Sequence, residues 1–363
     1  MIENFIQTQQ DLRLPTTDFE SFQCGHSILQ YQGQTLNLKN IDVAILGWKT
    51  NNYANIKKAF YQLTTNFPSN SVVDLGVVTP NIIPLLELVD YLVQNNVFPI
   101  IISPTATAIE GQLKAYEQRH ELLNLILMDS KVQFTPPNST AAPAVINQLL
   151  NYYPHLLFHL KCIGHQSYLN DQQAIEFLED KYFEILRLGK LQARLEEIEP
   201  MVRDADLAAF SLASIRSADA PANAYRNPNG LHAAEACKIM RYTAMSDRLS
   251  SICLHGFDLN LDDHNQTANM IAQLVWFVIE GFFARTHEYP IDKKGLQTYL
   301  VDNKTLGMPI HFYKSAKSDR WWFEIPKALH PQHRLMACSY LDYQIACDGD
   351  LPDRIINAIN RLS

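Results

Sequence analysis

Several apolar runs of this sequence are followed, or ended, by residues with ionisable side chains. Asp129 and Lys131 follow the run 123–128, His165 closes a second run, and Arg216 comes shortly after a third. A carboxylate and an imidazole can hold a cation or exchange protons, whereas an ammonium or a guanidinium binds an anion or neutralises a carboxylate. Because a buried carboxylate is costly unless it is paired, Lys131 is expected near Asp129; a solvated loop lysine is the alternative.

The loop after the third run carries more charge. Asp219 and Arg226 follow Arg216, and the three side chains could line a pocket. A salt bridge that only holds the loop together is the preferred interpretation, because exposed ion pairs of this kind are common.

Two other groups of residues could bind a metal ion, but a structural role is the preferred interpretation for both. His155 and His159 have a spacing that can bind metal on a helix, but on a strand residues four apart are too distant, so hydrogen-bonded histidines are preferred. Asp258, Asp262 and Asp263 precede a predicted helix, where a carboxylate caps the N-terminus. We expect no metal and no other cofactor at either group.

Trp321 and Trp322 are adjacent in a predicted hairpin. Neighbouring strand residues face opposite sides, so one indole could lie outside the core and form a contact surface. Packing of both against the main domain is the preferred interpretation.

The secondary structure that positions these residues can be predicted from the sequence, which alternates between strands and helices. Apolar, β-branched runs indicate strands, and amphipathic stretches between them indicate helices. The alternation predicts an α/β fold with a doubly wound parallel sheet in a three-layer α/β/α arrangement, whose ligands bind at the carboxyl ends of the strands. The expected strands are 41–46, 71–78, 97–102, 123–128, 156–163, 207–212 and 249–254, and the expected helices are 54–63, 82–94, 142–151, 172–194, 233–243 and 267–285.

The pattern divides the chain into three parts. An N-terminal segment covers 1–40, the α/β domain covers 41–289, and a small α+β elaboration packed on that domain covers 290–363. In the last part, 310–325 is typical of a hairpin, 335–343 of a strand, and the residues after Pro352 of a short helix.

Composition narrows the class of protein. The 363 residues carry a formal net charge of −8 without a basic stripe, so nucleic acid is not an expected partner. No run approaches the ~18 apolar residues of a membrane span, and the start of the chain lacks the features of a secretory signal, so we expect a soluble, cytoplasmic protein. The six cysteines form no CxxC pair and are expected to be reduced. Dinucleotide, nucleotide-phosphate, serine-hydrolase and zincin motifs are missing.

The first predicted strand ends in Gly47, a helix with KKAFYQL follows, and Asp74-Leu75-Gly76 comes next. This opening, and the order of the segments after it, are similar to those of the arginase, agmatinase and formimidoylglutamase (ureohydrolase) family. Residues 97–107 resemble the strand that leads into the family's GGDHS box, and residues 125–134 resemble the strand that leads into its DAHxD box. Residues 211–215 resemble the SxDxD box, and residues 230–235 resemble the GLTxxE box. Residues 163–168 are more similar to the formimidoylglutamase branch than to the others. The resemblance implies an arginase-like fold over roughly 40–285 and favours a homo-oligomer.

The resemblance also implies a two-manganese site, and this sequence has lost most of its ligands. By that alignment Asp129 alone is retained, and the lost ligand positions are Ala106, Lys131, Gln133, Ala213 and Ile215. The proton-shuttling histidine of the family falls on Thr140. Glu235 is retained where the family grips the cationic end of its substrate.

Three functions remain open at this point. The first is a catalytically inactive arginase-like protein with a binding, structural or interaction role, whose cleft residues are Asp129, Lys131, His165, Arg216 and Glu235 and whose partner is a protein or a small cationic ligand. The second is a working hydrolase of amidine or guanidine bonds, such as those of formimidoylglutamate, with a relocated site around Asp129, His165, Asp219 and Glu235. The third is a metal-free sensor of small molecules, with Glu235 as the cation anchor.

Overall fold

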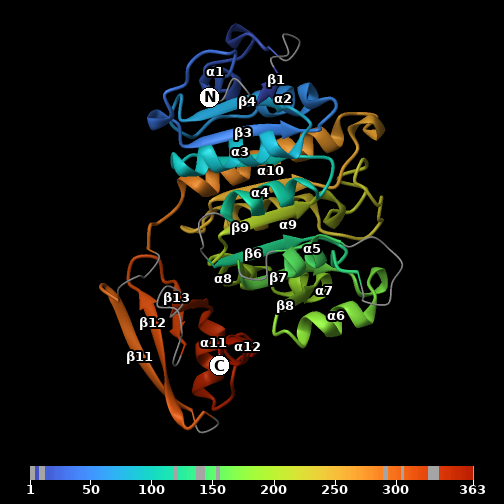
Figure 1. Cartoon of the computed structure of the whole chain (residues 1–363). Coiled ribbons are helices and arrows are strands. Elements are labelled where there is room, and N and C mark those ends of the chain that lie inside the picture. Colours follow the sequence, from blue (N-terminus) through green and yellow to red (C-terminus); the bar gives the residue numbers. More distant parts are fainter. Residues whose placement is uncertain are drawn as a thin grey trace.

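The computed structural model describes residues 5–7, 13–117, 122–135, 144–152, 156–288, 293–303, 306–325 and 335–362. Within these ranges the chain forms a large sheet with helices on both faces and a smaller antiparallel sheet near the C-terminus (Figure 1). No helix in the described ranges is long and apolar enough to cross a membrane.

The described part of the large sheet has ten strands. They are β1 (Ile6–Gln7), β2 (Leu29–Gln30), β3 (Val43–Trp48), β4 (Val72–Val78), β5 (Phe98–Ile102), β6 (Leu123–Met128), β7 (Leu157–His165), β8 (Glu184–Arg187), β9 (Leu207–Ser211) and β10 (Ser251–His255). Their order is β1-β4-β3-β5-β10-β9-β6-β7-β8, with β2 also beside β4. β1 is antiparallel to β4, and the other pairs are parallel. The predicted parallel sheet is confirmed.

Helices cover both faces of this sheet. Alternate strand residues point to opposite faces, so Val43 and Ile45 join one apolar core and Ala44 and Leu46 join the other. The first core is covered by α2 (Tyr53–Tyr61), α7 (Leu188–Ala193), α8 (Ile198–Val202), α9 (Ala233–Ala244) and α10 (Gln266–Phe283), and the second by α3 (Ile82–Gln94), α4 (Ala108–Glu117), α5 (Val145–Tyr152) and α6 (Gln172–Glu179). The three-layer α/β/α prediction is therefore confirmed.

The single helix predicted over 172–194 is wrong. The chain forms α6, then β8, then α7 in this range. Tyr182 has a positive φ of 57°, which a helix cannot accommodate, and the following residues pair with β7 instead. Apolar periodicity alone does not reveal such a short strand between two short helices.

The N-terminal residues extend the sheet. The strands β1 and β2 both pair with β4, and α1 (Cys24–Ser27) lies between them in the sequence. The backbone amide of Cys24 donates to the carbonyl of Leu63, just beyond α2, so this segment is tied to the α/β part by backbone hydrogen bonds.

The second sheet contains β11 (Leu296–Asn303), β12 (Met308–Ser315), β13 (Trp321–Glu324) and β14 (Leu335–Cys338), all antiparallel. The predicted hairpin is formed by β12 and β13. The strand predicted over 335–343 is too long, because Ser339 accepts from the backbone of Asp342 in a capping box and begins α11 (Tyr340–Cys347). The predicted C-terminal helix is α12 (Asp353–Leu362).

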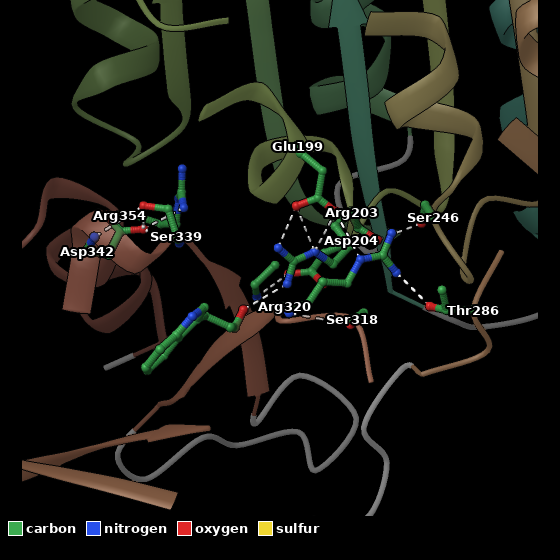
Figure 2. Close-up of polar contacts among 12 residues, drawn as sticks. Glu199, Arg203, Asp204, Ser246, Thr286, Ser318, Arg320, Ser339, Asp342 and Arg354 are labelled. Atoms are coloured by element: carbon green, nitrogen blue, oxygen red, sulfur yellow. Dashed lines mark hydrogen bonds and ion pairs between the residues drawn. The ribbon is translucent and has the colours of Figure 1, made fainter. Parts of the chain in front are cut away.

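A charged junction connects this second sheet to α8 (Figure 2). Arg203 donates to the carbonyl of Trp321 at 2.8 Å, and the backbone amide of Ala337 donates to Asp204 at 2.8 Å. Trp321 and Trp322 are 6% and 1% exposed, so both indoles are packed and neither forms an outer contact surface.

Candidate functional site

The strand ends that the sequence singled out meet at one edge of the sheet. The neighbours β5, β10, β9 and β6 lie at its centre and run parallel, so the loops after them converge at the carboxyl edge. Gly230 fixes one of these loops, because a Cβ there would lie 2.6 Å from the backbone nitrogen of Arg216. The segment before α9 is thereby held against the residues after β9.

Asp129 directly follows β6 and is almost fully buried. Its two carboxylate oxygens accept from neutral donors: the backbone amide of Lys131 at 3.2 Å, the hydroxyl of Ser130 at 3.3 Å and the side-chain amide of Gln133 at 2.8 Å. The hydroxyl of Ser211, at the end of β9, also bonds to it. Burial raises the pKa of the Asp129 carboxyl, and these hydrogen bonds only partly oppose that rise.

Lys131 does not form the expected ion pair. Its ammonium lies 4.0 Å from the ring centroid of Tyr225, and the ion pairs found among the described residues include none between Lys131 and Asp129 or Glu235. The expectation that its charge neutralises Asp129 is corrected: Lys131 approaches Asp129 through its backbone amide and turns its charge to an aromatic face.

Tyr225 is the residue of this cluster that the sequence did not reveal. It comes from the long loop after β9, its side chain bonds to Gln133, and burial raises the pKa of its phenol. A loop tyrosine 94 positions after Lys131 leaves no periodic or motif signal, so only the fold could identify it.

Three of the five lost ligand positions hold apolar side chains. Ala213 and Ile215 are fully buried, and Ala106 packs against the core from the loop after β5. Ile215 is fixed by a parallel bridge to Leu231. Nothing at these three positions can donate or accept through a side chain.

Arg216, Asp219 and Glu235 gather at the N-terminus of α9. Arg216 donates to both oxygens of Asp219, at 2.8 and 3.2 Å, which confirms the loop salt bridge. Asp219 also accepts from the backbone of Ala233 at 2.9 Å. Both contacts lower the pKa of the Asp219 carboxyl, the bond from Arg216 most strongly.

Glu235 is part of a capping box. One of its oxygens accepts from the backbone amide of His232 at 2.9 Å and from the side chain of Gln192 at 3.0 Å. The carboxylate is therefore held against the start of its own helix.

His165 ends β7 and is buried, with no hydrogen-bond partner for its Nδ1 atom. Burial lowers the pKa of its imidazole, although a hydrogen bond to the backbone of Leu186 opposes this. His255, at the end of β10, is also buried, and burial lowers its pKa to about 4. Both imidazoles are neutral at pH 7.

The remaining candidates have structural partners. His159 bonds to Glu184 at 2.8 Å, and Asp262 accepts from the first-turn amides of Thr267 and Ala268 in α10, as expected for a cap. His155 and Thr140 lie outside the described residues. In the parts of the chain that the structure describes, no group of three or more His, Cys, Asp or Glu side chains is arranged to hold a metal ion.

Comparison with known proteins identifies the fold. No protein-family model and no curated protein matches the chain. Solved structures do match: formiminoglutamase from Trypanosoma cruzi with two Mn²⁺ has a TM-score of 0.58 at 15% identity and covers 69% of this chain and 96% of its own. Formimidoylglutamase from Bacillus subtilis gives 0.61 at 16%, covering 71% and 91%, and agmatine ureohydrolase from Thermoplasma volcanium gives 0.56 at 14%, covering 74% and 96%. The chain has the arginase-like fold.

Proposed function

We propose that this chain is a catalytically inactive protein on the arginase-like fold, with a binding or interaction role. The observation that carries the proposal is the surroundings of Asp129. Its carboxylate accepts hydrogen bonds from neutral amides and hydroxyls, which partly compensate its burial and engage the oxygens that a metal ion would need.

The donor set at the carboxyl edge does not fit a pair of manganese ions. Two-metal hydrolysis needs several carboxylates or imidazoles that converge on ions ~3.5–4 Å apart. Ala106, Ala213 and Ile215 have no donor atom, and the ammonium of Lys131 would repel a divalent ion. The amide of Gln133 already donates to Asp129, so we derive no catalytic step through a metal at this edge.

A relocated hydrolytic site receives little support. Such a site would need free carboxylates, but Asp219 is held by Arg216 and by the backbone of α9, and Glu235 closes a capping box. A sensor that anchors a cation on Glu235 would likewise have to break the bond from Gln192. Both alternatives require the start of α9 to rearrange.

The test combines metal content with activity. Full-length protein is dialysed against excess Mn²⁺, freed of unbound ions and analysed for metal, and formamide release from formimidoylglutamate is measured in parallel. We expect well below one ion per chain, no release above the buffer rate, and the same result for Asp129→Asn. About two ions per chain that disappear in Asp129→Asn would overturn the proposal.

A further inference from the structure

We propose that a cavity between α8 and the C-terminal sheet binds a planar aromatic molecule that carries an anionic group. The cavity does not involve the carboxyl-edge residues. Arg203 and Met245, which line it, lie just before β9 and β10, so it opens at the opposite edge of the large sheet. The inference therefore goes beyond the proposed function and does not depend on it.

The cavity has the size of a small-molecule site. Its volume is about 840 Å³, within the roughly 300–1,000 Å³ typical of ligand pockets. One wall comes from α8, and the others come from β11, β12, β13 and the start of α11. Two parts of the chain that are far apart in sequence thus build it, and such junctions are common places for ligand sites.

Four aromatic rings form a continuous platform on one side of this cavity. Trp321 stacks on Tyr343 with ring centroids 4.8 Å apart and lies 5.0 Å from Tyr299. Tyr340 extends the platform, 5.5 Å from Trp321 and 5.9 Å from Tyr343. Tyr340 is 54% exposed, so part of this side chain is accessible to a ligand in the cavity.

The spacing of these rings favours a flat ligand over a bulky cation. An aromatic cage for a quaternary ammonium holds its rings apart so that the cation fits between their faces. Here the rings are in contact with one another, so no space for a cation remains between them. A planar ring that stacks on the accessible part of Tyr340 would typically contribute ~1–3 kcal/mol.

Two buried guanidinium groups lie beside the platform. Glu199 accepts from Arg203, with N–O distances from 2.6 to 3.2 Å, and forms a second ion pair with Arg320 at 3.2 Å (Figure 2). One carboxylate thus serves two guanidiniums, which are 7% and 8% exposed. The two guanidiniums are fixed in place by these contacts, so their N–H groups are already ordered on this side of the cavity.

Lys314 supplies a cation that a ligand can reach. Its ammonium lies 5.8 Å above the ring of Trp321 and 2.7 Å from Asp319, whose side chain is 82% exposed. A pair with so exposed a carboxylate contributes only ~0–1 kcal/mol, so a ligand anion can displace Asp319 readily. Counting the charged lining residues, three cations face two carboxylates.

These features together specify the ligand chemistry. The aromatic ring of the ligand lies against Tyr340. Its anionic group replaces Asp319 as the partner of Lys314. A nucleoside monophosphate and an aromatic carboxylate share this chemistry.

Calorimetric titration of the full chain tests the proposal with four probes. Adenosine 5′-monophosphate and indole-3-acetate each combine a ring with an anion, whereas adenosine lacks the anion and inorganic phosphate lacks the ring. At least one of the first two is expected to bind below ~1 mM, with adenosine and phosphate at least about tenfold weaker. The two ring–anion probes distinguish a phosphate ligand from a carboxylate ligand.

Variants locate the binding in this cavity. Lys314→Met and Tyr340→Ala should each weaken the bound probe at least about tenfold, while Tyr340→Phe, which keeps the ring, should retain it. Lys238→Met is the matched control, because Lys238 also pairs with an exposed carboxylate, that of Glu196. The proposal is overturned if neither ring–anion probe binds below ~1 mM, if adenosine equals the monophosphate and indole-3-acetate fails, or if Lys314→Met behaves like Lys238→Met.

Discussion

The side-chain amide of Gln133 donates a 2.8 Å hydrogen bond to a carboxylate oxygen of Asp129. This bond stabilises the buried carboxylate of Asp129 through a neutral partner. It is one of the contacts on which the proposed loss of metal binding rests. It also makes Gln133 a structural residue, which is testable.

Gln133→Ala should destabilise the protein by ~1–3 kcal/mol, because it leaves a buried carboxylate short of a donor. Urea unfolding measures the change, provided the transition is two-state. Gln172→Ala is the control, since Gln172 makes a similar bond to Glu176 on an exposed helix surface and should shift stability by less than ~0.5 kcal/mol. Equal effects of the two substitutions would show that the bond at Asp129 is dispensable.

Lys131→Met should cost only ~0.5–1 kcal/mol, the range of a cation–π contact at a half-exposed ring. A buried ion pair with Asp129 would instead cost ~3–5 kcal/mol. A double-mutant cycle with Tyr225→Leu separates the pairwise contribution from other losses. A coupling energy of zero would mean that the ring and the ammonium do not interact in solution.

Arg203→Met should destabilise the protein by ~1–3 kcal/mol, because Arg203 is buried and bonds both Glu199 and the carbonyl of Trp321, while Glu199 keeps its ion pair with Arg320. The double variant with Glu199→Gln should be no more stable than Arg203→Met, because Arg320 then loses the same carboxylate. Denaturant unfolding of the three proteins measures both changes. A double variant that is more stable than Arg203→Met would mean that Arg320 alone does not compensate the buried charge of Glu199.

Acid should destabilise the protein through His255. Its folded pKa is lowered from 6.5 to about 4 by burial, so the unfolded chain takes up a proton in this window before the folded chain does. The stabilising contribution is present above pH 6.5 and is lost as the pH falls. Between pH 7 and pH 5, wild type should lose ~2 kcal/mol more than His255→Gln. Parallel curves for the two proteins would place His255 in a solvated environment.

The sequence predicted the parallel core well, because buried strands and long helices have strong periodic signals. The strand 123–128 and the helix 82–94 agree residue for residue with β6 and α3. Short elements did not give such signals. β8 has four residues and α8 has five, and each is stabilised by neighbours distant in sequence rather than by its own pattern.

The candidate site was predicted as a set of positions but not as a set of contacts. Asp129 and Arg216 lie at the strand ends where the alternation placed them. Which partner each side chain takes depends on loops whose path no local rule fixes. Lys131 contacts the ring of Tyr225, which lies 94 positions later in the sequence. Glu235 accepts a hydrogen bond from Gln192, which lies 43 positions earlier.

The capping of α9 changes how substitutions at Glu235 act in a cell. A capping residue typically contributes ~1 kcal/mol to stability, and a loss of 1–2 kcal/mol can alter the steady-state amount of a protein several-fold through proteases and chaperones. Selection on protein abundance alone is then enough to retain an acidic residue at this position. Glu235 would persist in descendants of this chain through helix stability, with no substrate needed to maintain it.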